Sequence, residues 1–256
     1  MSAFVSVDRD GPAAVITLRR ADKRNALSRS LIAELTVAFA QARDDAAVRA
    51  VILTGDGPAF CAGMDLGELR DTLTAGDEVV WDDAVKLATL FDLIYTLPKP
   101  TVAAINGPAV AGGAGLMSVC DIAVAVPAAT FGYPEVRRGI VAALVMPHLL
   151  RLVGERAARR LLLTGELITA EEALRVGLIT EIAAPDALVS AAKRIAGQCA
   201  AGGPEALATT KRLLAGLSKQ ALSIEDLAKE SAAPRLGDEC RAGLSAFFRQ
   251  EPPPWA

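Results

Sequence analysis

The sequence predicts a helix-rich α/β fold, and three observations lead to it. Short runs of β-branched residues, each near Gly, Pro, Asp or Asn, recur in the first half of the chain. Apolar residues at helical spacing lie between these runs. Hydrophobic residues make up 52% of the 256 residues and aromatic ones only 4%, so small and branched aliphatic side chains must pack the core. The length predicts one large domain, or a core with an appendage.

The elements of the first half follow in order. Two strands, joined by a hairpin-like turn at residues 8–12, open the chain. A helix follows, because apolar residues recur at positions 31, 32, 35 and 39. The unit is therefore strand, strand, helix, strand. The predicted strands are Phe4–Val7, Ala14–Leu18, Ala50–Leu53, Thr101–Ile105 and Ile122–Val126.

Helical signals dominate after about residue 145. Thr169 and Glu172 have the spacing of a capping box ahead of an apolar run. No low-complexity linker divides the chain, so we expect one core with a helical extension. An extension rich in Leu and Ala packs either against another subunit or on its own core, and the sequence alone leaves both open.

Composition and charge exclude several classes of protein. Lys+Arg 27 against Asp+Glu 30 gives a net charge of -3, so neither nucleic acid nor anionic lipid is an expected partner. The four cysteines are far apart and His148 is the sole histidine, so no metal site and no disulfide framework are expected. We find no basic leader and no apolar stretch of about 18 residues, which predicts no membrane span and a cytoplasmic protein.

Two glycine-punctuated segments, 54–66 and 105–116, each follow a predicted strand and lead into a predicted helix. Helix N-termini present unpaired N–H groups, so two of them side by side can hold an oxyanion. The alternative is a pair of tight turns that serve packing only. A dinucleotide fingerprint fails, because Ser118 stands where its third glycine belongs. A serine hydrolase fails as well, because no GxSxG elbow is present.

Several motifs occur in order along residues 4–250. They are RADKRNAL at 20–27, AFCAGMDL at 59–66, PTVAAING at 100–107, the glycine pair at 112–113 leading to CD at 120–121, and FGYPEV at 131–136. In sequence and spacing they resemble the crotonase family, the enoyl-CoA hydratases and isomerases. The resemblance implies a crotonase-like spiral of ββα turns followed by trimerising helices. It divides the chain into a core for acyl-CoA binding and catalysis, residues 1–200, and a helical oligomerisation region, residues 201–256.

Members of this family bind an acyl-CoA thioester and stabilise its enolate. The resemblance implies that the backbone N–H groups of Ala62 and Gly112 form the oxyanion hole, and that Glu135 is the catalytic carboxylate. Hydratases of the best-known type carry a second glutamate on the glycine-rich helix, and here that position is Gly115. A buried carboxylate that faces an apolar pocket would have its pKa raised toward a value useful for proton transfer.

The departure at Gly115 leaves three functions open. The first is an enoyl-CoA hydratase, a lyase in which Glu135 acts alone or with Glu68 or Asp71. The second is a double-bond isomerase that uses Glu135 only, and the third is an acyl-CoA binding protein without catalysis. Hydration is the leading hypothesis, because some relatives acting on branched or glutaconyl-type thioesters have the same Gly-Leu pair.

The resemblance also implies the groups that bind CoA. No cofactor is expected besides the coenzyme A of the substrate itself, and a homotrimer or hexamer is expected. Asp65 serves equally as the N-cap of the next helix, and that role ranks first. The implied CoA-binding residues are Lys23, Arg24, Ala62, Asp65 and Phe247. Candidates for the acyl pocket are Leu69, Leu73, Trp81, Leu87, Phe91 and Tyr133.

Overall fold

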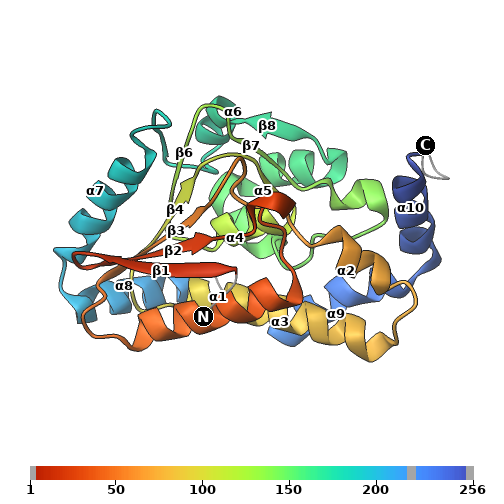
Figure 1. The fold of residues 1–256 in the computed structure, drawn as a ribbon, viewed down its shortest axis with the longest axis horizontal. Helices are drawn as coiled ribbons and strands as arrows, with labels where there is room; N and C mark the ends of the chain where they lie inside the picture. The colour runs from red at the N-terminus through yellow and green to blue at the C-terminus, as the bar shows by residue number, and fades with distance from the viewer. Residues whose placement is uncertain (1–3, 218–222, 252–256) are drawn as a thin grey trace.

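The computed structural model describes residues 4–217 and 223–251, and its centre is a six-stranded sheet (Figure 1). The strand order is β1-β2-β3-β4-β6-β9, with β1 and β2 antiparallel and every later neighbour parallel. A smaller sheet has the order β5-β7-β8. The strands are β1 Val5–Asp10, β2 Ala13–Leu18, β3 Ala50–Gly55, β4 Thr101–Ile105, β5 Ala109–Val110, β6 Ile122–Ala125, β7 Thr130–Gly132, β8 Leu167–Thr169 and β9 Glu181–Ile182.

Helices surround the sheet. Helix α1 begins where the Ser28 hydroxyl accepts a hydrogen bond from the Leu31 N–H, and its buried face carries the apolar residues that predicted it. The helices are α1 Arg29–Asp44, α2 Leu66–Asp71, α3 Asp77–Tyr95, α4 Gly112–Ser118, α5 Met146–Thr164, α6 Ala170–Arg175, α7 Leu188–Ala200, α8 Pro204–Leu217, α9 Ile224–Ala232 and α10 Asp238–Arg249. Short 3-10 turns are η1 Ala21–Lys23, η2 Pro134–Arg138 and η3 Ala233–Leu236.

Small side chains let the layers approach closely. Strand β4 is buried along its whole length and carries two alanines, and helix α7 packs over β3 and β4. The five strands and the helix predicted from the first half are confirmed, and the first two strands form a hairpin. The turn is shorter than predicted: residues 8–10 continue β1 and pair with β2, so only residues 11 and 12 connect the strands. No helix within the described residues combines the length and apolarity needed to cross a bilayer.

The sequence analysis missed four strands, β5, β7, β8 and β9, each only two or three residues long. The capping box at Thr169 is half formed. Its hydroxyl accepts from the Glu172 N–H, but the Glu172 carboxylate binds Arg160 and Arg175 instead of returning to the helix start.

Helices α9 and α10 pack on the same chain through two small apolar clusters beside the main core. Helix α9 lies along α3 through Val80, Ala84, Ala228 and Ala232 (Figure 1). Helix α10 packs against η2, and its buried residues Cys240 and Leu244 cluster with Leu69 of α2. Of the apolar residues predicted to be covered by a neighbouring subunit, Leu217 and Leu227 have side chains outside the described part. Leu213 and Leu214 of α8 are exposed.

Candidate active site

A cavity of about 140 Å³ lies between the sheet ends and the C-terminal helices. Three residues that the sequence analysis assigned to catalysis, Ala62, Gly112 and Glu135, all line it. They are far apart in the chain, and the fold brings them to one place. The remaining wall is largely apolar and consists of Met64, Leu66, Leu69, Leu87, Phe91, Val110, Ala111, Pro134, Ile140, Val141, Ala142, Ala143, Leu144 and Val145, with the polar residues Arg138, Ser231 and Arg235.

Glu135 lies in η2, directly after β7 and Pro134. Its side-chain atom Oε2 is enclosed and has no hydrogen-bond partner within the described residues. Burial raises the pKa of Glu135 to about 7, and the charge of Arg138 only partly opposes this effect. Both the ionised and the protonated form of this carboxyl group are therefore available near neutral pH.

The position that carries a second glutamate in the best-known hydratases has no room for one. A Cβ atom built on Gly115 would lie 2.3 Å from Cγ1 of Val145 and 2.9 Å from the ring of Phe91. Real Cβ atoms essentially never approach other atoms so closely, so even alanine would force these side chains to move. Apolar side chains thus occupy the space of the second carboxylate.

The two acids considered as helpers do not line the cavity. Glu68 accepts a hydrogen bond from the Arg29 N–H, and Asp71 is exposed beside Arg70. Glu135 is the one carboxylate among the residues that line the cavity. Of the predicted acyl-pocket residues, Leu69, Leu87 and Phe91 line it, whereas Leu73, Trp81 and Tyr133 do not.

One N–H of the predicted donor pair, that of Ala62, is engaged elsewhere. The Ala62 N–H donates to the carbonyl of Arg24 at 3.0 Å, so this group is already bonded. Met64 and Leu27 form an isolated parallel β-bridge. In it the Leu27 N–H donates to the Gly63 carbonyl, and the Asp65 N–H donates to the Leu27 carbonyl. That pairing leaves the Met64 N–H facing away from Leu27. A Cβ built on Gly112 would lie 3.8 Å from the Met64 nitrogen.

The start of α4 presents the second donor. Gly112 is the first residue of that helix, where an N–H has no helical acceptor. Ala111, just before it, has φ 53° and ψ −126°, a conformation that is costly for any residue except glycine. Gly63, with φ 89°, lies against it, and a Cβ there would be 2.9 Å from the Ala111 Cβ. The strained turn thus packs against Gly63, next to the loop that carries Met64.

The basic segment predicted to bind CoA phosphates lies beside this loop. Lys23 and Arg24 are exposed on η1 and at its end, and neither lines the cavity. The Arg24 carbonyl, however, accepts the Ala62 N–H, so the segment is fixed next to a cavity residue. Its charged side chains therefore lie near the cavity at the protein surface.

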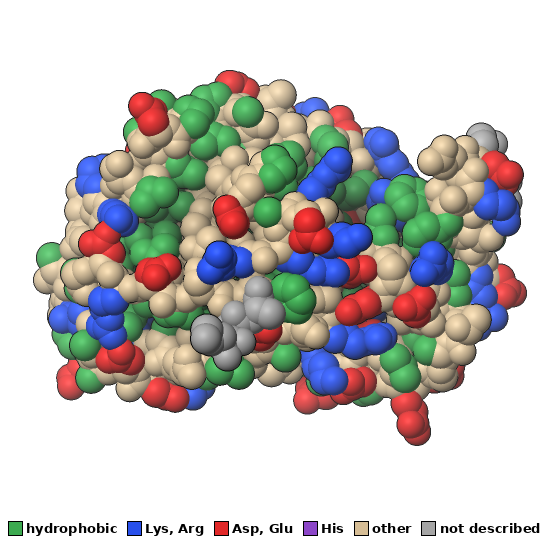
Figure 2. Space-filling model, in the orientation of Figure 1, with side chains coloured by type: hydrophobic (Ala, Val, Ile, Leu, Met, Phe, Trp, Pro, Cys, Tyr) green, Lys and Arg blue, Asp and Glu red, His purple; other side chains and the backbone are tan. Residues whose placement is uncertain are grey.

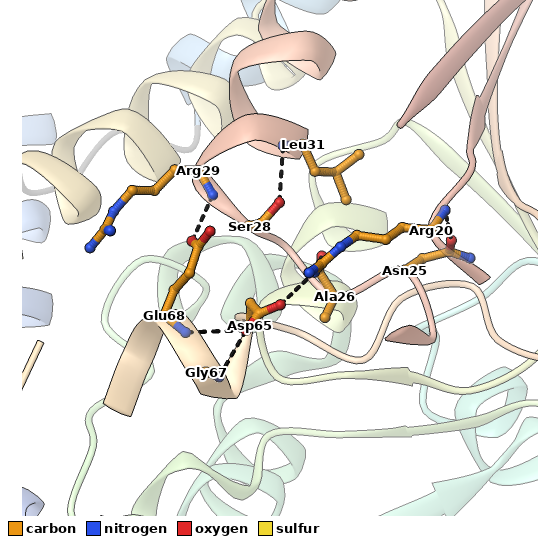
Figure 3. A network of polar contacts seen from close by, with 9 residues as sticks. All are labelled: Arg20, Asn25, Ala26, Ser28, Arg29, Leu31, Asp65, Gly67 and Glu68. Carbon is orange, nitrogen blue, oxygen red and sulfur yellow. Dashed lines mark hydrogen bonds and ion pairs between the residues drawn. The ribbon is translucent and has the colours of Figure 1, made fainter. Parts of the chain in front are cut away.

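Asp65 caps helix α2. Its carboxylate accepts hydrogen bonds from the N–H groups of Gly67 and Glu68 and forms an ion pair with Arg20 (Figure 3). Burial acts to raise the pKa of Asp65, but the hydrogen bonds from Arg20 and from these backbone groups outweigh it and hold that pKa below its ordinary value. The Asp65 side chain thus caps the helix, which is the role that the sequence analysis ranked first.

Phe247 on α10 does not line the cavity but touches a residue that does. The Arg138 guanidinium lies 4.5 Å from the centre of its ring, and Phe248 packs edge-to-face against it. His148 is remote from the cavity and packs on Tyr95. Within the described part of the chain, no three His, Cys, Asp or Glu side chains gather as potential metal ligands.

Comparison with known proteins shows the family of this chain. The sequence profile described as Enoyl-CoA hydratase/isomerase matches residues 9–256. The chain belongs to the enoyl-CoA hydratase/isomerase family. A Thermus thermophilus protein named "Putative enoyl-CoA hydratase" is 44% identical, over 98% of this chain and 99% of its own. The short-chain-enoyl-CoA hydratase of Clostridium acetobutylicum is 34% identical, over 82% of this chain and 80% of its own.

Solved structures agree with this membership. An enoyl-CoA hydratase from Mycobacterium avium has a TM-score of 0.87 at 36% identity, with 100% of both chains covered. The fold is therefore the α/β crotonase fold that the motifs predicted, and the protein is an enzyme of the enoyl-CoA hydratase/isomerase family.

The sequence analysis did not identify several of the residues that line the cavity. Met64 lies inside the quoted AFCAGMDL motif, so a signal for it was present. Arg138 lies one turn after Glu135 and directly follows Arg137. Two adjacent arginines in a sequence indicate an exposed surface, so nothing marked Arg138 as a cavity residue. Ser231 and Arg235 come from α9 and η3, about a hundred residues after Glu135, where no motif marks them.

Proposed function

We propose that this protein is an enoyl-CoA hydratase, which adds water across the 2,3 double bond of an enoyl-CoA thioester. The carboxylate of Glu135, whose Oε2 is enclosed and without a partner, on the same cavity as Met64 and Gly112 carries this proposal. The names of the relatives support hydration over the other reactions of the family.

In the proposed mechanism, the N–H groups of Met64 and Gly112 donate to the thioester oxygen. The Glu135 carboxylate takes a proton from water as the water oxygen bonds to C3, and the electron pair of the double bond moves onto the thioester as an enolate. The protonated Glu135 then delivers its proton to C2, which gives the 3-hydroxyacyl-CoA and restores the carboxylate. Backbone donors of this kind stabilise a developing oxyanion by about 3 kcal/mol each.

The surroundings of the cavity complete the proposal. Lys23 and Arg24 would meet the CoA phosphates at the surface, with Phe247 near the same opening through its contact with Arg138. The steps above use only groups of the protein and the thioester, so we propose that no cofactor is required beyond the CoA moiety of the substrate. A cytoplasmic location and a homotrimer or hexamer belong to the same proposal.

Isomerisation is the second candidate, because Glu135 is the one carboxylate among the cavity-lining residues. A single carboxylate can remove a proton from C2 of a 3-enoyl-CoA and return it to C4. Hydration with one carboxylate is chemically complete as well, since the same group serves first as base and then as acid.

One experiment separates the candidates. The protein is incubated with crotonyl-CoA and, separately, with a 3-enoyl-CoA in H₂¹⁸O, and absorbance and product mass are followed. A hydratase removes the conjugation of crotonyl-CoA and incorporates one ¹⁸O. Conjugation gained from the 3-enoyl-CoA without ¹⁸O would instead identify an isomerase. Tight binding with neither change would identify an acyl-CoA binding protein.

A further inference from the structure

Glu135 and Arg138 lie on the same face of the 3-10 turn η2. Side chains three residues apart in such a turn eclipse one another, and both of these line the cavity. Burial raises the pKa of Glu135 and the charge of Arg138 opposes that rise, whereas burial lowers the pKa of Arg138 and the charge of Glu135 opposes that fall. The ionisation of Glu135 therefore depends on where the Arg138 guanidinium group lies.

The guanidinium group contacts an aromatic ring and leaves the carboxylate unpaired. Oε2 of Glu135 and Nε of Arg138 are both enclosed, and neither has a hydrogen-bond partner within the described residues. An ion pair between the two side chains would satisfy both atoms. The guanidinium group lies instead 4.5 Å from the centre of the Phe247 ring on α10, where a cation is attracted to the aromatic face.

The Phe247 ring is itself held in place from a second side. Phe248 packs edge-to-face on it, with 5.5 Å between the ring centres, and the Arg70 guanidinium group of α2 lies 5.6 Å from the centre of the Phe248 ring. Helix α10 thus joins the turn that carries Glu135 to the helix that follows the Met64 loop. In Figure 2, Lys and Arg side chains lie beside hydrophobic ones on the face between the body of the molecule and α10.

Other titratable groups around Glu135 are engaged elsewhere. Tyr133 shares a hydrogen bond with Ser118, Nε of Arg137 donates to a carbonyl at the end of α5, and Arg235 donates twice to a serine of α9. Helices α5 and α10 pack on η2, and their described titratable side chains do not line the cavity. These side chains are His148, Arg151, Glu155, Arg156, Arg159 and Arg160 of α5, and Asp238, Cys240, Arg241 and Arg249 of α10.

Building on the proposed function, we propose that Phe247 is a positioning residue, whose ring holds the Arg138 guanidinium group off Glu135 so that this carboxylate can both take up and release a proton. A direct ion pair would keep Glu135 ionised and make it a weaker base. Without the cation, the buried carboxyl group would be largely protonated at neutral pH and could not accept the first proton. The C-terminal helix thereby controls the ionisation of the catalytic group.

An infrared titration tests this role without turnover. The protonated carboxyl band of Glu135 is the one lost in Glu135→Gln, and its pH midpoint should lie at about 7 in the unmodified protein. Arg138→Met removes the cation and should raise this midpoint by roughly one pH unit. Phe247→Leu frees the guanidinium group to pair with the carboxylate and should lower the midpoint by a similar amount. The double variant should behave as Arg138→Met, because Phe247 acts through Arg138.

Two controls accompany these variants. Arg137→Met changes the neighbouring arginine, which bonds to the Thr164 carbonyl, and should leave the midpoint unchanged. Phe247→Tyr keeps the aromatic ring and should titrate as the unmodified protein does. Phe247 is 38% exposed, so we expect its variants to fold. A merely structural contact, or a lost contact with CoA, would change stability or affinity without moving the midpoint in opposite directions.

Three results would overturn the proposal: an unchanged midpoint in Arg138→Met, a midpoint that Phe247→Leu does not lower, or a lowered midpoint in the double variant. The inflection of kcat/KM with pH should move in the same directions, because it reports the ionisation of the free enzyme. The predicted shifts in a protein that does not hydrate crotonyl-CoA would reject the proposed reaction but keep the role of Phe247.

Discussion

At the scale of single residues, the proposed chemistry depends on the surroundings of one carboxylate. The enclosed Oε2 of Glu135 faces a mostly apolar cavity, which explains why its pKa lies about 7 and not in the ordinary range for glutamate. A group that titrates near the working pH is effective both in taking and in returning a proton. This property allows one carboxylate to perform both steps of the proposed hydration.

We predict that Glu135→Gln lowers turnover at least a hundredfold and leaves acyl-CoA binding nearly unchanged. The amide keeps the size of the side chain but cannot transfer the proton, and general acid–base catalysis contributes 10²–10⁴-fold. Steady-state kinetics and calorimetry measure the two quantities. Glu155→Gln, at an exposed position paired with Arg159, is the control and should behave as the unmodified protein. Retention of more than a few per cent of the rate in Glu135→Gln would rule out its catalytic role.

The pH dependence follows from the same group. The carboxylate form of Glu135 must accept the first proton, so kcat/KM should fall as the pH is lowered through about 7. The residual activity of Glu135→Gln should lack this inflection. A profile that stays flat from pH 5 to 8 in the unmodified protein would show that another group is the base.

The sequence predicts some of these residues and not others, for a physical reason. Glu135 and Gly112 lie in motifs that resemble those of the crotonase family, and that resemblance implied their roles. The choice between the Ala62 and Met64 N–H groups depends on which of them bonds elsewhere, and that becomes visible only once Arg24 and Leu27 are seen beside the loop. Arg235 has no motif, because burial of a lone arginine depends on tertiary packing.

At the scale of elements, the close approach of α4 to α3 and to residue 145 removes the space for a second carboxylate. We predict that Gly115→Glu destabilises the protein by about 1–3 kcal/mol or more and does not raise the hydration rate, because Phe91 and Val145 occupy that space. Urea unfolding measures the first effect. Gly197→Glu, at an exposed position of α7 with nothing within 4 Å of the new Cβ, is the control and should cost little. A stable and faster Gly115→Glu enzyme would contradict this account.

Helices and strands could be predicted where they are long enough to show a hydrophobic periodicity or a continuous apolar run. Strand β4 reads as five consecutive buried residues and α1 as a clear apolar stripe, so both were found. Strands β8 and β9 have three and two residues, too few for any alternation to appear, and partner strands distant in the chain define them. Glu172 shows that a local signal can also mislead. The sequence predicts that it completes a capping box, but its side chain forms ion pairs with Arg160 and Arg175 instead.

At the scale of the whole molecule, α8 leaves apolar surface uncovered. Leu213 and Leu214 are 53% and 60% exposed, whereas α9 and α10 bury much of their apolar surface on their own chain. We predict a mass of three or six times 26.6 kDa in sedimentation equilibrium, and a lower mass for a Leu213→Asp, Leu214→Asp double variant, because charge would enter an apolar contact.

Thr209→Asp, at an exposed polar position of the same helix, is the control for the assembly prediction and should leave the mass unchanged. Phe247 is a poor choice for this test, because its ring lies against Arg138 of its own chain, and a change there would also disturb the cavity. A monomeric and active unmodified protein would show that the trimer expectation does not apply to this chain.

The packing of α9 and α10 through two small clusters separate from the main core has a consequence for native-state hydrogen exchange. Cooperative units with few buried contacts open more often than the central sheet does. We therefore expect amide protons of α9 and α10 to exchange through a subglobal opening, and those of β2, β3 and β4 only through global unfolding. That opening would remove Ser231 and Arg235 from the cavity wall, so a bound acyl-CoA should slow exchange in α9. Mass spectrometry of peptic fragments would show whether the C-terminal helices and the acyl chain are energetically linked.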